Sequence, residues 1–302
     1  MVKYFHYNAN GVESWQSRPI YTDEASTIKG SNWGVGNAIK FQPDNWHLFR
    51  FSAEYANRLP DHMELFGNGI WVVQNFSLKP ERSFNFNLGM RAAVPEKHTL
   101  EVNTFYRLTR DMILLVPILS PYARYENQEN VKGYGVELDG NVKLNPRWHV
   151  NSNVTWQALR LFGIENSTDN WKNGARLRNT PYMFGNIGIN YLSKPIIKGK
   201  GLLKLYATYN FLKEFYLETI PRRLEPKGLF STADVNTELI IPNQHLVNLG
   251  VNLRFPNDRF ALGAEVKNLL NKDLFDNYRV QQAGRSLHLK LNYSIQQSYK
   301  KK

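Results

Sequence analysis

The stretch Phe260–Ile295 reads FALGAEVKNLLNKDLFDNYRVQQAGRSLHLKLNYSI. From Ser286 onward, apolar and polar side chains alternate. The apolar set is Leu287, Leu289, Leu291, Tyr293 and Ile295, and the polar set is His288, Lys290, Asn292 and Ser294. A period of two predicts an extended strand whose two faces meet different environments. Residues 260–267 alternate in the same way, so the stretch predicts two strands joined by a polar connection.

Similar alternation recurs through the sequence and predicts about twelve strands, each near the roughly 9–11 residues that a tilted strand needs to cross a bilayer. The connections between them alternate in length. The short ones contain Pro43, Pro95, Pro146, Pro195 and Pro256, and the long ones follow Asn8, Leu59, Arg110, Leu161, Lys213 and Lys272. Residues 111–129 are expected to form one of the long loops. This parity is typical of outer-membrane barrels, which keep short turns on the periplasmic side.

The polar sides of the strands carry Asn, Thr, Glu, Lys and Arg, which suit a wet lumen better than a packed core. The predicted fold is therefore all-β: an antiparallel transmembrane β-barrel whose apolar side chains face lipid, with residues 1–302 as one domain. Several aromatic residues fall near strand ends, where we expect an interfacial girdle rather than ligand contacts. They are Trp33, Trp46, Trp148, Trp156, Tyr191 and Tyr293.

The composition is compatible with this interpretation. The chain has 302 residues, no Cys, a formal net charge of +12 and a mean hydropathy of −0.48. A polar mean fits a barrel, because only alternate residues face lipid. The longest apolar run, Met112–Leu119, is far shorter than the roughly 18 residues of a spanning helix. The first residues carry neither the apolar segment nor the cleavage site of an export signal, so we expect a mature fragment or a part of a longer protein.

Three sets of residues resemble motifs of the TonB-dependent outer-membrane receptors. In the C-terminal set, Ala283 stands where the family usually has Pro. A second set lies in the connection after Tyr55, and a third opens a later strand. The residues that match are Asn268, Leu269, Phe275, Tyr278, Gly284 and Arg285 in the first set, Arg58, Pro60, Glu64, Leu65, Pro80 and Glu81 in the second, and Gly135 and Glu137 in the third. We expect structural roles for these residues.

The resemblance implies a barrel of about 22 strands with a plug in its lumen. The present sequence would supply the C-terminal part, about twelve strands, without the plug. The implied function is energy-coupled uptake of a scarce nutrient across the outer membrane of a Gram-negative bacterium. A ferric siderophore or similar metal chelate is the expected cargo, with cobalamin, haem and oligosaccharide as alternatives. The implied partners are membrane lipid and lipopolysaccharide, the nutrient, and a periplasmic TonB-type energy transducer that acts through the plug.

Loop residues with aromatic or guanidinium groups are the candidates for contact with an anionic, aromatic chelate. They are Tyr122, Arg124, Tyr125, Trp171, Arg176, Arg178, Tyr216, Arg222 and Arg223. The alternative interpretation is a solvated loop surface or one that contacts lipopolysaccharide. Any role in ligand binding is a property of the loops, since the strands would form the wall.

Other kinds of site find little support in the sequence. The histidines are scattered without metal-ligand spacing, and of these only His62 and His245 lie at or near long loops. The pairs Asp61/Glu64 and Asp273/Asp276 lack a partner base or nucleophile, so turn and cap roles are expected. We therefore expect no enzyme, cofactor or metal site. The lysines gather at residues 194–204 and 300–302 rather than on a recognition motif, which argues against nucleic-acid binding.

Two further function classes stay open at the level of sequence. A passive porin-like channel would have the same strand pattern without a plug. A soluble carbohydrate-binding β-protein would bury its apolar faces between two sheets. The direction in which the apolar side chains point decides between these classes.

Overall fold

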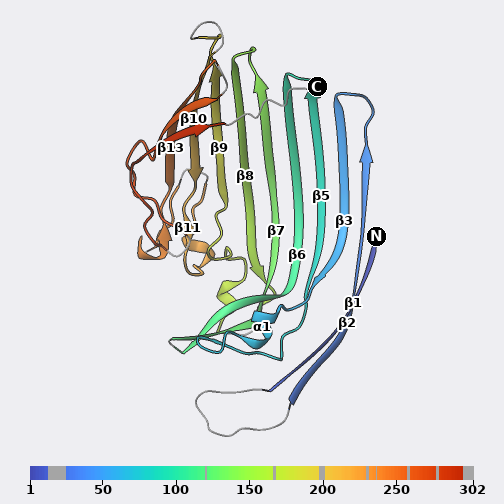
Figure 1. The fold of residues 1–302 in the computed structure, drawn as a ribbon. Coiled ribbons are helices and arrows are strands. Elements are labelled where there is room, and N and C mark those ends of the chain that lie inside the picture. The colour runs from blue at the N-terminus through green and yellow to red at the C-terminus, as the bar shows by residue number, and fades with distance from the viewer. Residues whose placement is uncertain are drawn as a thin grey trace, which may run out of the picture.

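The computed structural model describes residues 1–12, 25–119, 121–165, 168–196, 201–228, 231–235, 237–256, 259–276 and 279–294. A 13-stranded sheet dominates the fold, and it curves into an open trough (Figure 1). Its main path follows chain order. The strands on that path are β1 (Val2–Val12), β2 (Ala25–Phe41), β3 (His47–Arg58), β5 (Glu81–Val94), β6 (His98–Leu119), β7 (Tyr122–Lys143), β8 (Trp148–Phe162), β9 (Met183–Leu192), β10 (Leu202–Leu212), β13 (Gln244–Arg254), β14 (Phe260–Lys267) and β15 (Ser286–Tyr293).

Short elements gather at one end of the trough (Figure 1), which we call the loop end. They are α1 (His62–Phe66), β4 (Val72–Val73), β11 (Phe215–Tyr216), β12 (Ile240–Ile241) and the 3₁₀ helices η1 (Asn170–Lys172), η2 (Arg222–Leu224) and η3 (Thr237–Leu239). The opposite end, the turn end, carries the short connections that contain the five prolines. No helix in the described part of the chain is long and apolar enough to span a membrane.

The strand register places mostly apolar side chains on one face of the sheet and mostly polar side chains on the other. On one face Leu88 stands opposite Phe51 and Thr104, and the row continues through Val136 and Trp156. Because side chains alternate along a strand, a slip of one residue would move every apolar side chain to the other face. The pairing therefore gives the sheet an apolar face and a polar face across most of its width.

The polar face is held by contacts between strands. Asn87 on β5 donates from Nδ2 to Ser52 Oγ on β3 at 3.1 Å, and Arg50 on β3 reaches across β5, so that its Nη2 lies 2.8 Å from Glu101 Oε2 on β6. Asn186 Nδ2 donates to Asn153 Oδ1 at 3.0 Å. Cross-strand pairs of this kind stabilise a sheet that has a solvated face.

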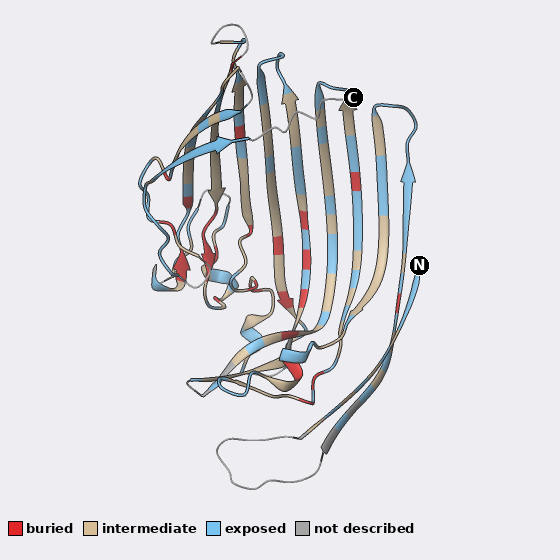
Figure 2. Ribbon diagram, viewed as in Figure 1, coloured by how far each residue is buried: buried red, intermediate tan, exposed pale blue. Residues whose placement is uncertain are grey.

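Within the part of the chain that the structure describes, the apolar face is not packed against a second layer. Leu88 is 57% exposed and Leu289 is 76% exposed, and Figure 2 shows exposed and half-buried residues along most of the strands. The prediction that apolar side chains point outward is confirmed, and it excludes the soluble sandwich. A bare apolar surface of this size requires lipid or a partner to cover it.

The aromatic pairs Trp148–Tyr191 and Phe260–Tyr293 lie near strand ends, as expected for a girdle, whereas Trp33 and Trp156 lie in the middle of β2 and β8. The ring centroids of Tyr4 and Trp33 are 4.6 Å apart, and those of Trp148 and Tyr191 are 4.8 Å apart. Tyr293 pairs with Phe260 at 4.8 Å. Such residues favour the interface between hydrocarbon and water because a ring has an apolar body and a polar edge.

The prediction of a long loop at residues 111–129 is wrong. β6 and β7 continue through this region as a hairpin that projects beyond the neighbouring strands, so Tyr122, Arg124 and Tyr125 lie on β7 and not in a loop. The register shifts between Thr109 and Met112, again at Ile113, and between Pro117 and Leu119. Each shift interrupts the alternation of apolar and polar side chains. Because that alternation is the sequence signal of a strand, the sequence did not indicate strands in this region.

The start of the chain also differs from the expectation. A long connection was expected to follow Asn8, but β1 and β2 pair along residues 2–12 and 25–35. A hairpin that extends past the membrane has no lipid on either face. Its sequence is therefore free of the apolar alternation that marks the membrane-spanning strands.

Buried apolar residues concentrate at the loop end, where Figure 2 shows much of the red. Three small clusters form there around the roots of the connections. They consist of Leu65, Leu78 and Ile113; of Val131, Leu161 and Leu177; and of Tyr216, Ile220 and Ile240. The loops are thus folded onto the strand ends.

Candidate functional site

The loop end is held by an arginine of the second family-like set. Arg58 ends β3, and its Nη1 lies 2.9 Å from Glu64 Oε2, while its Nε lies 2.7 Å from Glu81 Oε2. Glu81 Oε1 accepts from Arg58 Nη2 at 2.8 Å and from the Ile113 N–H at 2.7 Å. One guanidinium therefore ties the connection after β3 to β5, and Glu81 ties β5 to β6.

The helix α1 within that connection is stabilised at its first turn. Asp61 accepts from the Glu64 N–H at 2.9 Å, and Glu64 accepts from the Asp61 N–H at 2.9 Å. This reciprocal pair is a capping box. It gives Asp61 and Glu64 the cap role predicted for them. Leu65 packs with Leu78 and Ile113, and Pro60 and Pro80 flank the helix connection half-buried.

The third set lies on the wall of the polar face. An added Cβ on Gly135 would come within 2.5 Å of the Trp156 carbonyl oxygen and 2.6 Å of the Phe105 ring. Glu137, two residues further on, faces a hollow of about 220 Å³. The other residues that line this hollow are Asn87, Asn103, Phe105, Arg107, Gln157 and Leu159.

Gly135→Ala is expected to destabilise the protein by about 1–3 kcal/mol, because the new methyl group meets backbone and a ring that are both fixed in the sheet. Gly140→Ala on the same strand is the matched control, since its nearest contact would be Ser152 Oγ at 3.4 Å. Denaturant unfolding of the complete receptor measures both. Equal stability of the two variants would contradict the steric argument.

The C-terminal set fixes the connection between β14 and β15. Asn268 has φ 50°, in the left-handed region that Asn tolerates. Its N–H donates to Asn248 Oδ1 at 3.0 Å, and its side chain exchanges bonds of 2.8 and 3.0 Å with the Lys272 backbone. The backbone N–H of Leu269 donates to the Val247 carbonyl at 2.8 Å.

The remainder of the set extends this backbone network. The Phe275 N–H donates to Gln244 Oε1 at 3.0 Å, and the Arg285 N–H donates to Asn271 Oδ1 at 2.9 Å. Gly284 precedes Arg285, and a Cβ on it would come 3.0 Å from the same Asn271 oxygen. Tyr278 and Ile295 lie outside the described residues. The placements agree with a structural role for the set.

Two of the ligand candidates, the half-buried Arg176 and the buried Tyr216, lie in contacts between loops. Glu225 accepts from Arg160 Nη2 at 3.0 Å, from Arg176 Nε at 3.1 Å and from the Arg176 N–H at 3.0 Å. The guanidinium of Arg176 also stacks on Tyr182, 3.9 Å from the ring centroid. We call Arg160, Arg176 and Glu225 the loop clasp, because they join β8, the β8–β9 loop and the β10–β13 loop.

The clasp lies in a dry environment. The side chains of Glu225, Arg176 and Arg160 are 4%, 13% and 15% exposed, and Tyr216 is 2% exposed. Burial raises the pKa of Tyr182 to about 12. A buried carboxylate is tolerated only when it is well paired, and here two guanidinium groups share one carboxylate. No pattern in the sequence indicates this pairing, because Glu225 lies 49 residues after Arg176 in an irregular loop.

The other candidates differ in exposure. Trp171 is 46% exposed, with Lys172 Nζ 5.8 Å from its ring centroid. Arg178 Nη1 lies 3.8 Å from the exposed Glu218. Arg222 and Arg223 are exposed on η2, and Arg222 lies beside Gly174. The β8–β9 and β10–β13 loops therefore bring Trp171 and Arg222 to one region.

The candidates of the β6–β7 hairpin form a second region. Arg124 pairs with Glu126, Tyr125 packs on the Leu65 cluster, and the Tyr122 and Trp71 ring centroids are 6.2 Å apart. Neither histidine singled out earlier gathers metal ligands. His62 stacks on Phe66 at 4.6 Å, and His245 bonds the Tyr209 hydroxyl at 2.8 Å. No group of His, Cys, Asp and Glu in the described ranges has the arrangement of a metal site.

Comparisons with known proteins agree with this architecture. A search among curated proteins found no match. Solved structures similar to the chain include the copper transporter OprC, at 16% identity and a TM-score of 0.65, covering 91% of this chain and 41% of the other. BauA, the ferric preacinetobactin receptor from Acinetobacter baumannii, matches at 13% identity and a TM-score of 0.61, with 92% and 38% coverage. The FrpB iron transporter from Neisseria meningitidis matches at 16% identity and a TM-score of 0.66, with 89% and 40% coverage.

At these identities the likeness shows the fold, and the chain spans about 40% of the length of these proteins. The family model described as TonB dependent receptor-like, beta-barrel matches residues 2–269. Members of this family are outer-membrane transporters of Gram-negative bacteria and not enzymes. The curved antiparallel sheet, its outward apolar face and the three motif sets agree with that match. The chain belongs to the TonB-dependent receptor family and forms part of its β-barrel domain.

Proposed function

We propose that the receptor containing this chain takes up a metal chelate, most simply a ferric siderophore, across the outer membrane with energy from a TonB-type transducer. The family match over residues 2–269 is the observation that carries the proposal. The similar structures support the cargo class, because their names describe a copper transporter, an iron transporter and a ferric preacinetobactin receptor. The described residues form wall and loops, so the energy-coupling step belongs to other parts of such a receptor.

The chemistry of the loop end supports an anionic ligand. Arg222 and Arg223 are exposed beside the loop that carries Trp171. Guanidinium groups donate paired hydrogen bonds to carboxylate or catecholate oxygens, and an indole offers a flat face to an aromatic chelate. Arg176 and Tyr216 support the same surface from beneath, because the clasp fixes the loops that carry these groups.

Growth on defined iron sources tests the function. Deletion of the complete gene is expected to abolish growth on at least one ferric siderophore as the sole iron source, and the gene on a plasmid is expected to restore it. Uptake is expected to stop when the proton-motive force is collapsed. Uptake that continues without that energy would indicate a passive channel, and unchanged growth on every chelate would contradict a role in iron supply.

Replacement of both Arg222 and Arg223 by Gln is expected to weaken binding of the ferric chelate about a hundredfold, because each arginine contributes a charged hydrogen bond of on the order of 1.5 kcal/mol. Quenching of tryptophan fluorescence by the chelate measures the affinity. Lys227→Gln in the same loop is the control, since it removes an exposed charge five residues from Arg222. Equal affinities of the two variants would show that η2 does not contact the ligand.

A further inference from the structure

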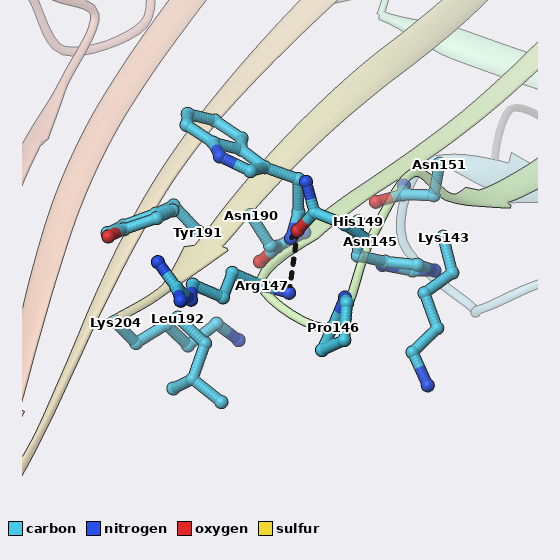
Figure 3. A pocket seen from close by; sticks show the side chains of 11 residues that line it. Lys143, Asn145, Pro146, Arg147, His149, Asn151, Asn190, Tyr191, Leu192 and Lys204 are labelled. Atoms are coloured by element: carbon cyan, nitrogen blue, oxygen red, sulfur yellow. Dashed lines mark hydrogen bonds between the residues drawn. The ribbon is translucent and has the colours of Figure 1, made fainter. Parts of the chain in front are cut away.

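A hollow of about 430 Å³ lies at the turn end, around the β7–β8 turn and the adjoining ends of β9 and β10. Four basic side chains line it, and no acidic residue does. Figure 3 shows Arg147 reaching from the turn toward Tyr191, Leu192 and Lys204, with Lys143 on the other side of Pro146. The fourth basic residue is His149.

The turn holds these groups in place through its backbone. Asn145 Oδ1 accepts from the N–H groups of Arg147 and Trp148 at 2.9 and 3.0 Å. The Arg147 carbonyl then accepts from the Leu192 N–H at 2.9 Å, which ties the turn to β9. Two hydrogen bonds therefore fix the backbone of Arg147, one at its N–H and one at its carbonyl, while its side chain extends into the hollow.

The positive charge of the hollow is not compensated. Lys143, Arg147 and Lys204 have no ion-pair partner within the described ranges. Lys204 Nζ lies 6.0 Å from the centroid of the Tyr206 ring. Like charges held together raise the local potential, which favours an anion between them.

Three asparagines also line the hollow, Asn145, Asn151 and Asn190, and its aromatic side is formed by Trp148 and Tyr191 of the membrane face. Trp148 and Tyr191 have the parity of the apolar face, whereas Lys143, His149 and Asn190 have the parity of the polar face. Residues from both faces of the sheet can line the same hollow only at the ends of the strands, where the sheet stops separating the two sides. The site therefore lies on the rim of the wall, at the level of the Trp148–Tyr191 girdle pair.

We propose that this hollow binds the head group of an anionic phospholipid of the periplasmic leaflet. The phosphate would lie among Lys143, Arg147 and Lys204, and the glycerol and first acyl carbons would lie against Trp148 and Tyr191. A basic rim beside an aromatic wall at head-group depth is the combination that recognises such lipids. A free phosphate would leave the aromatic wall uncovered, and so would an acidic peptide on the lumen side.

Native mass spectrometry of the complete, delipidated receptor tests the proposal with dioleoylphosphatidylglycerol and dioleoylphosphatidylcholine as probes. The wild type is expected to bind the anionic lipid in preference. Arg147→Gln is expected to weaken that binding about fivefold, the equivalent of about 1 kcal/mol for one charge near a membrane surface. The combination of Lys143→Gln, Arg147→Gln and Lys204→Gln is expected to weaken it about a hundredfold.

Lys40→Gln at the turn end of β2 is the matched control, because it removes an exposed lysine from another part of the same rim and is expected to bind the lipid as the wild type does. Arg147→Lys is expected to retain most of the affinity. Equal binding of the two lipids by the wild type would overturn the proposal, as would wild-type affinity in the triple variant. Displacement of the lipid by millimolar inorganic phosphate would indicate a phosphate site instead.

Discussion

Leu88→Arg is expected to destabilise the receptor in a bilayer by about 2–4 kcal/mol, the cost of an arginine on the lipid face near the membrane midplane. Leu88 lies at the middle of β5 and is 57% exposed on the apolar face. The guanidinium would have to reach the interface or draw water into the hydrocarbon. Reversible unfolding of the receptor in lipid vesicles by guanidinium chloride measures the loss.

Asn87→Arg provides the control from the adjacent position. Asn87 points to the polar face, where its amide bonds Ser52, and its exposed environment contains other charged side chains. We expect a change within about 1 kcal/mol, as for other exposed substitutions. If Asn87→Arg cost more than Leu88→Arg, the two faces would be assigned the wrong way round and the membrane interpretation would fail.

Glu225→Ala is expected to cost about 3–5 kcal/mol, because it leaves two buried guanidinium groups without their shared carboxylate. The loss is expected first in the loops. Hydrogen exchange of the backbone amides in the β8–β9 and β10–β13 loops should accelerate strongly, while the amides of the strand centres keep their protection. Ligand affinity should fall as well, since the clasp positions the surface that includes Trp171 and Arg222.

Glu218→Gln separates this effect from a general loss of negative charge. Glu218 is also in the β10–β13 loop and lies 3.8 Å from Arg178, but its side chain is 62% exposed. An exposed ion pair contributes about 0–1 kcal/mol, so little change is expected. Wild-type exchange rates in Glu225→Ala would show that the apolar cluster of Tyr216, Ile220 and Ile240 holds the loops without the clasp.

The clasp also explains how nine ligand candidates divide. Arg176 and Tyr216 have the same residue types as Arg222 and Tyr122, and the sequence placed all of them in or near loops. Burial separates them: Tyr216 is 2% exposed, whereas Arg222 and Arg223 are exposed. An arginine or tyrosine in a loop can either contact the ligand or stabilise the loop. Only its neighbours in the folded structure show which of the two roles it has.

The sequence by itself determined the spanning part of this protein. Lipid on one side and water on the other require apolar and polar side chains to alternate along every spanning strand. That alternation can be recognised in the sequence, for example from Leu287 to Tyr293, without any knowledge of contacts. Short turns with Pro and Asn were equally legible, because their chemistry is local. Strand pairing in chain order followed from the short connections between neighbours.

Tertiary structure alone decided what lies beyond the membrane. The β6–β7 hairpin continues through bulges that erase the period, and Glu225 meets Arg176 across 49 residues of chain. The rim hollow joins Arg147 to Lys204 in the same way, over three strands. These residues do not lie at a boundary between lipid and water, so no regular alternation marks them in the sequence. Each contact joins segments whose spacing along the chain is arbitrary. Only the folded structure therefore shows that they meet.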